Sequence, residues 1–207
     1  MHKAFVCLFA LSVSMLAGEK WKPLFNGKNM NGWEHVGPGE FTLQNHQLVT
    51  HGGMGLLWFN GQKLGDTTVR VIFKTSGPTD NSGVYIRLPE KPRDAWYGVH
   101  NGYEVQIDAA GDDWHCTGAL YSLSKATKRP QKPAGEWNTM DIVLKGQTTT
   151  VFLNGEQVNR FEGNQQVPER QHWFEPARGP RPDSGYIGLQ NHDDHTTIYF
   201  KEISYKK

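Results

Sequence analysis

The sequence predicts an all-β domain, either a sandwich or a barrel, and three observations carry this prediction. Short segments of alternating apolar and polar residues recur along the chain, as expected for half-buried strands. Turn-forming residues separate them, with 23 glycines and 11 prolines among 207 residues. No stretch combines a helical apolar period with capping residues. Many short strands joined by turns, in a chain of this length, indicate packed sheets or a closed barrel.

The first residues are typical of an export signal. A basic start precedes an apolar stretch over residues 4–16, which is too short to cross a bilayer. Ala17 and Gly18 then supply small side chains that suit signal-peptidase cleavage, and the residue directly after them is not a cysteine that could receive a lipid. We therefore expect a signal peptide over residues 1–18 and a secreted or periplasmic domain over residues 19–207, without a membrane anchor after cleavage. An uncleaved transmembrane anchor is the alternative.

Alternation predicts six strands in the mature chain, at residues 69–75, 83–88, 103–108, 140–144, 149–153 and 196–205. Asn154-Gly155 lies between two such runs and predicts a hairpin, because both residues tolerate a positive φ. Two proline-rich segments, 124–136 and 163–184, do not fit strands. Long loops in a compact domain are usually functional or disordered, and we expect the second to form a rim or lid beside a groove.

Composition excludes several classes of function. Formal net charge is +1, from 22 basic and 21 acidic residues, and no basic run or amphipathic helix indicates nucleic acid or a membrane surface. Removal of the signal leaves Cys116 as a single thiol, so the domain depends on a hydrophobic core and not on an internal disulfide. Nine histidines and seven tryptophans suit stacking on sugar rings and hydrogen bonding to hydroxyls.

The segment Gly102–Asp108 is the most informative. On a strand, Glu104, Gln106 and Asp108 share one face, while Tyr103, Val105 and Ile107 share the other. Two carboxyl groups and an amide would make a poor core, because buried charge is costly unless it is paired. They suit the floor of a groove that binds a polyhydroxylated ligand and moves protons. The pattern indicates carbohydrate.

Seven blocks, in order along the mature chain, resemble the 3-keto-disaccharide hydrolase domain family. The blocks are residues 24–33 (LFNGKNMNGW), 81–87 (NSGVYIR), 102–108 (GYEVQID), 117–121 (TGALY), 135–138 (GEWN), 185–192 (GYIGLQNH) and 198–203 (IYFKEI). The resemblance implies a jelly-roll β-sandwich of two antiparallel sheets, similar to concanavalin A-type lectins and glucanases. It also implies extracytoplasmic cleavage of sugars whose C3 hydroxyl is oxidised to a ketone. A sugar 3-oxidoreductase that makes this substrate is the expected pathway partner.

A C3 ketone makes the C2 proton acidic, so that its loss can expel the C1 substituent, after which water can add. Such a site needs a base near C2, a group facing the ketone oxygen and an acid at C1. We assign Glu104 or His192 as base and the other as acid, with Arg87 polarising the ketone. Gln106, Asp108 and Gln190 would orient hydroxyls, and Trp96, Tyr97 and Trp114 would stack on sugar rings.

Other interpretations stay open at this point. Arg87 could instead pair with Glu104 as a salt bridge, Glu104 could be purely structural, and His192 could be an exposed loop residue. A two-carboxylate glycosidase needs acids about 5–5.5 Å or 6.5–9.5 Å apart. Positions 104 and 108 lie about 13 Å apart on a regular strand. A non-catalytic carbohydrate-binding module would use the same groove. No cofactor is expected, although the acidic loops 112–115 and 191–195 could hold calcium through oxygen ligands.

Overall fold

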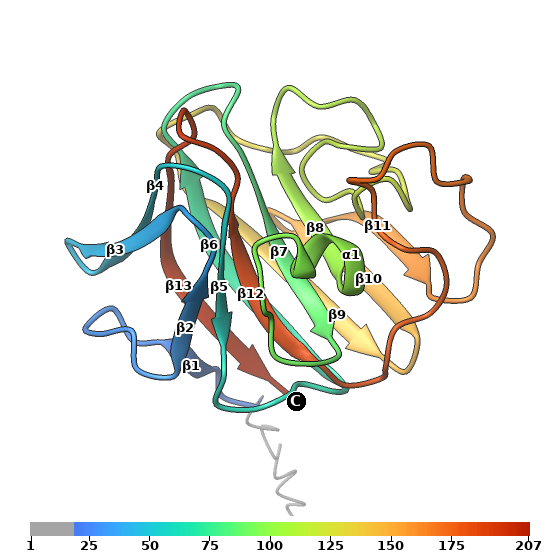
Figure 1. Cartoon of the computed structure of the whole chain (residues 1–207), viewed down its shortest axis with the longest axis horizontal. Coiled ribbons are helices and arrows are strands. Elements are labelled where there is room, and N and C mark those ends of the chain that lie inside the picture. Colours follow the sequence, from blue (N-terminus) through green and yellow to red (C-terminus); the bar gives the residue numbers. More distant parts are fainter. Residues whose placement is uncertain (1–18) are drawn as a thin grey trace, which may run out of the picture.

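Two antiparallel sheets packed face to face form the molecule (Figure 1). The computed structural model describes residues 19–207, and the expected signal peptide lies outside the described residues. The larger sheet has the order β11-β10-β9-β6-β13-β4-β3, with β1 paired to β13, and the smaller has the order β2-β5-β12-β7-β8. The larger sheet comprises β1 (Lys22–Phe25), β3 (Glu40–Gln44), β4 (Gln47–His51), β6 (Thr67–Thr75), β9 (Asn138–Lys145), β10 (Thr148–Leu153), β11 (Glu156–Glu162) and β13 (Ile198–Lys206). The smaller sheet comprises β2 (Trp33–Val36), β5 (Gly55–Phe59), β7 (Asn81–Leu88), β8 (Tyr103–Asp108) and β12 (Tyr186–Asn191). The predicted two-sheet sandwich is confirmed.

The main hydrophobic core fills the space between the sheets. Val84 on β7, Leu189 on β12, and Val105 and Ile107 on the edge strand β8 contribute to it from the smaller sheet, and each is fully buried. The alternation predicted for residues 103–108 is therefore correct, since the odd-numbered residues of β8 pack inward. Glu104 and Gln106 consequently point to the outer face of this sheet.

All six strands predicted by alternation are present, and Asn154 and Gly155 adopt φ values of 51° and 85° in the hairpin between β10 and β11. Besides β11 and β12, the short strands β1 to β5 escaped that prediction, because runs of four or five residues give too little periodicity to recognise. The five-residue helix α1 (Tyr97–Asn101) escaped it for the same reason. Within residues 19–207, no helix is both long and apolar enough to cross a membrane.

The outer face of the smaller sheet positions the site. A second apolar cluster of Leu56, Trp58, Tyr85, Leu88 and Val99 joins α1 to β5 and β7. In Figure 1, α1 lies in front of β7 and β8. The polar side chains of β8 and β12 next to this cluster are thereby removed from solvent without entering the core.

Candidate active site

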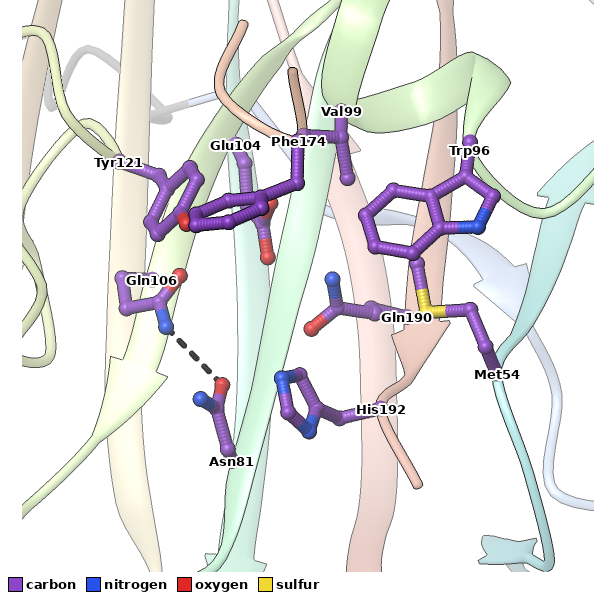
Figure 2. A pocket seen from close by; sticks show the side chains of 10 residues that line it. All are labelled: Met54, Asn81, Trp96, Val99, Glu104, Gln106, Tyr121, Phe174, Gln190 and His192. Carbon is purple, nitrogen blue, oxygen red and sulfur yellow. Dashed lines mark hydrogen bonds between the residues drawn. The ribbon is translucent and has the colours of Figure 1, made fainter. Parts of the chain in front are cut away.

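A cavity of about 310 Å³ lies on the outer face of the smaller sheet. Figure 2 shows side chains that are far apart in the sequence, from Met54 to His192, converging on it. The lining residues are Met54, Asn81, Trp96, Val99, Glu104, Gln106, Tyr121, Phe174, Gln190 and His192. Five of the sequence-predicted residues thus meet in one place: Glu104, Gln106, Gln190, His192 and Trp96. The segment 163–184 also contributes, through Phe174, so its expected place beside the groove is confirmed.

Glu104 is the carboxyl group of the cavity. Its side chain is almost completely buried, with 4% of the residue exposed. Burial raises the pKa of the Glu104 carboxyl from its usual 4.5 to about 8, and a hydrogen bond from Gln190 offsets part of this effect. Gly83 on β7, the register partner of Gln106, leaves the room that the Glu104 carboxyl occupies, because a Cβ there would overlap Glu104. At neutral pH the neutral, protonated form of Glu104 therefore predominates.

His192 follows the last residue of β12 and forms a pair with its neighbour Asp193. The Nδ1 atom of His192 lies 2.7 Å from Oδ2 of Asp193. Burial alone would raise the pKa of Asp193, but hydrogen bonds from His192 and from the backbone of His195 and Thr196 hold this pKa below its usual range. An ionised Asp193 fixes the imidazole and leaves Nε2 for the cavity, which the ring faces in Figure 2.

Two side-chain amides line the cavity with an unused acceptor each. Gln106 donates to Oδ1 of Asn81 at 2.9 Å, and Gln190 donates to the hydroxyl of Tyr85 at 2.7 Å. Oε1 of Gln106 and Oε1 of Gln190 are buried and have no hydrogen-bond partner. A buried acceptor without a partner is costly, so these two oxygens are suited to receive hydroxyl protons of a bound ligand.

Tyr121 brings a neutral donor to the same space. Burial raises the pKa of Tyr121 to about 12, and the negative charge of Glu104 adds to this effect. The phenol therefore keeps its proton across the range in which proteins work, and it can donate to a developing negative charge. Asn81, Tyr121 and Phe174 were missed as site residues in the sequence. The first two fall within the blocks that carry the family resemblance, so those blocks held the available signal.

Arg87 does not line the cavity, and its predicted contact with the substrate ketone is wrong. Alternation along β7 would place it beside Tyr85 on the outer face, but the pairing of β7 with β12 shifts register there. Arg87 itself adopts a φ of 56°, which redirects its side chain. The guanidinium donates to the carbonyl oxygens of Pro182 and Gly146, and the residue is 1% exposed. Arg87 therefore links the loops that contain Gly146 and Pro182, and it is not paired with Glu104.

Three predicted ligand-binding residues also lie outside the cavity. Asp108 ends β8, where its Oδ1 accepts from the backbone N–H groups of Ala110 and Gly111 and forms a turn. Tyr97 packs against the second apolar cluster. Trp114 lines a separate hollow, under Lys125 at 5.2 Å from its ring. Their predicted contact with ligand in the groove of Glu104 is wrong for this cavity.

The acidic loops use their carboxylates within the protein. Asp112 accepts from the backbone of Trp114 at 2.8 Å and contacts His115 at 2.7 Å. Asp193 is engaged by His192 and by backbone N–H groups, as described above. Within residues 19–207, no group of three or more His, Cys, Asp or Glu side chains is arranged to hold a metal ion.

Comparison with solved structures places the fold. A proposed glycosyl hydrolase from Parabacteroides distasonis is 25% identical, with a TM-score of 0.73 over 91% of this chain and 99% of that one. A carbohydrate-binding module of family 66 from Bacillus subtilis is 16% identical, with a TM-score of 0.59 over 86% of this chain and 98% of that one. A Bacillus subtilis protein with a galectin-like fold is 11% identical, with a TM-score of 0.65 over 90% and 94%. The last two show the fold alone.

These neighbours and this chain share a β-sandwich of two antiparallel sheets. The chain belongs to the family described as the 3-keto-alpha-glucoside-1,2-lyase-like domain, whose model matches residues 20–206. The resemblance found in the sequence is thereby confirmed. A comparison with curated proteins finds no significant match.

Proposed function

We propose that this protein is an exported enzyme that cleaves 3-keto-glycosides by removing the C2 proton and expelling the C1 substituent. The observation that carries the proposal is the pairing of groups in one cavity. A buried carboxyl with a pKa of about 8 shares the cavity with an imidazole that an ionised carboxylate orients. A buried neutral carboxyl beside an oriented imidazole supplies one group that can donate a proton and one that can accept it.

The base of the reaction is His192. Its Nε2 takes the C2 proton, while Asp193 holds Nδ1 and stabilises the imidazolium that forms. The electron pair of the C2–H bond forms a C2=C3 double bond, and the negative charge of the resulting enolate lies on the C3 oxygen. The Tyr121 phenol, which stays neutral, donates a hydrogen bond to the enolate oxygen in the role first assigned to Arg87.

The acid is Glu104. As the enolate collapses, the C1–O bond breaks, and the protonated Glu104 carboxyl delivers its proton to the leaving oxygen. The products of this step are the free aglycone and a 1,2-unsaturated 3-keto sugar. Gln106 and Gln190 hold the sugar by accepting from its hydroxyls at their unpartnered oxygens. Addition of water to the unsaturated sugar completes a net hydrolysis, and release without water makes the enzyme a lyase.

A two-carboxylate glycosidase is a weaker alternative for this cavity. Among its lining residues, all within the described part of the chain, Glu104 is the one carboxylic acid. Asp193 is hydrogen bonded to His192, and Asp108 is bound in a turn. Retaining and inverting mechanisms both need a second carboxyl facing the sugar.

A non-catalytic binding module is the second candidate, favoured by the likeness of the fold to carbohydrate-binding domains. Such a module has no use for a buried carboxyl of raised pKa. Burial keeps the Glu104 carboxyl neutral because it removes the water that would solvate the carboxylate. This difference in chemistry favours the enzyme.

The test is incubation of residues 19–207 with a 3-keto-α-glucosyl disaccharide and with its unoxidised parent, followed by mass spectrometry. We expect sugar release from the keto compound alone, with the unsaturated product lighter than the hydrolysed one by a single water. Glu104→Gln and His192→Ala should abolish most of this release, whereas Glu136→Gln, at an exposed site, should not. Release from neither compound, together with affinity for the parent, would establish the binding module instead.

A further inference from the structure

Exposed aromatic side chains gather at the mouth of the cavity. Three large apolar side chains are more than a third exposed among residues 19–207, and two of them, Trp96 and Trp173, lie here, at 36% and 64%. Their ring centroids are 4.8 Å apart. Phe174 joins them at 5.9 Å from Trp173, and it lines the cavity with Trp96. We call Trp96, Trp173 and Phe174 the aromatic platform.

The loop that carries Trp173 is fastened on both sides of it. The ring of His100 contacts the carbonyl oxygen of Trp173 at 3.1 Å. Downstream, Glu175 and Arg178 form an ion pair at 2.7 Å, and Arg178 also donates to the carbonyl of Pro168 at 2.8 Å. Trp173 is 64% exposed although its backbone is held in place. Its indole ring therefore lacks apolar contacts that packing against the protein would give it. Exposed apolar surface of this kind usually marks a binding site.

Polar and apolar groups are separated along the depth of the cavity. Glu104, Gln106 and Gln190 belong to the strands at its floor and are buried, with 2–4% exposure. The aromatic platform belongs to α1's N-terminal flank and to the loop 163–184. In Figure 2, Phe174 and Trp96 lie on the upper side of the cavity, across from Asn81 and His192. A volume of about 310 Å³ is at the lower end of the range for ligand pockets, about 300–1,000 Å³. The floor therefore suits one sugar ring, and a second ring must lie outside.

We infer that the aromatic platform binds the leaving group of the glycoside, as a pyranose or aryl ring attached at C1. This inference rests on the proposed function for the position of the keto sugar at the floor. The leaving group must reach solvent after the C1–O bond breaks, and the mouth of the cavity gives it that route. Tryptophan faces stack on the apolar faces of sugar and aryl rings, while a methyl leaving group is too small to reach Trp173.

Equilibrium binding of unoxidised ligands tests the inference without any turnover. Titration calorimetry would compare p-nitrophenyl α-glucoside with methyl α-glucoside, in wild type, Trp173→Ala and Trp137→Ala. The control residue Trp137 precedes β9 and packs against Lys74 and Lys201 of the larger sheet, away from the cavity. We expect Trp173→Ala to weaken the aryl glucoside about three- to tenfold, the size of one aromatic stacking contact, and to leave the methyl glucoside unchanged. Trp137→Ala should change neither.

Equal losses for both ligands, no loss for either, or no binding of the aryl glucoside to wild type would overturn the inference. Turnover separates it from the proposed function. If 3-keto-glycosides are not cleaved but Trp173→Ala selectively weakens the aryl ligand, the platform stands and the reaction is wrong. If they are cleaved and Trp173→Ala lowers kcat/KM equally for methyl and aryl leaving groups, the reaction stands and the platform is wrong.

Discussion

Replacement of Glu104 by glutamine should change how the stability of the protein depends on pH. Glu104 is buried with a pKa of about 8, against 4.5 when exposed. Between these values the unfolded chain has lost a proton that the folded protein keeps. Stability contributed by the neutral carboxyl is therefore complete below pH 4.5 and is lost as pH rises to about 8. At 1.36 kcal/mol for each pH unit, moving the pKa from 4.5 to about 8 corresponds to about 5 kcal/mol.

Urea unfolding at pH 5, 7 and 9 measures this quantity. Glutamine has the shape of the protonated acid and does not ionise. The stability of Glu104→Gln should therefore lack the part of the pH dependence that comes from ionisation of Glu104. We expect the free energy of unfolding of wild type to fall by about 4 kcal/mol relative to Glu104→Gln between pH 5 and pH 9. The exposed Glu136→Gln serves as the matched control and should follow wild type throughout.

A constant difference between wild type and Glu104→Gln over this range would refute the reasoning. It would mean that Glu104 titrates as an exposed carboxyl does and that burial does not hold it neutral. The assignment of Glu104 as the acid would then fail with it.

Three further predictions concern other residues. His192→Ala should lower kcat on a 3-keto-glycoside by about 10²–10⁴-fold, because the base is lost. Asp193→Asn should give a kcat between those of wild type and His192→Ala, because the base is present but misoriented. Added imidazole should restore part of the kcat of His192→Ala, and an unchanged kcat in that variant would contradict the assignment. Tyr121→Phe should lower kcat by about 10²–10³-fold, as for removal of one oxyanion donor, with an unchanged melting temperature as the control. Arg87→Ala should cost about 3 kcal/mol of folding free energy, because the carbonyls of Pro182 and Gly146 lose a buried donor, yet the folded variant should keep its kcat; a lost kcat without lost stability would return Arg87 to the site.

The part of the site that lies on a regular strand could be predicted from the sequence. Glu104 and Gln106 were placed correctly because side chains alternate on β8, and apolar neighbours fixed which face is buried. Gln190 and His192 lie in the block 185–192, one of those that carry the family resemblance. The two-sheet fold followed in the same way, from the longer strands.

Residues whose place depends on broken periodicity could not be predicted. Arg87 has the right spacing for the outer face, but a register shift and a positive φ turn it away. Asp108 has the right spacing too, but the end of β8 lets its carboxylate bind the following backbone. Phe174 reaches the cavity from a loop about 70 residues beyond Glu104, and no local pattern encodes that contact.

The most direct test of the account follows the hydrogen at C2. A 3-keto-α-glucoside carrying deuterium at C2 would be cleaved in ordinary water, with recovered substrate and an enzyme-free sample as controls for spontaneous exchange. Because His192 removes this hydrogen in the proposed reaction, we expect no deuterium in the unsaturated sugar and loss of deuterium to solvent, through the exchangeable imidazolium, in the hydrated sugar. Cleavage should also be slower than for the undeuterated substrate. A released sugar that retains all of its deuterium at C2, formed as fast as from the undeuterated substrate, would show direct displacement at C1 and would contradict the proposed reaction.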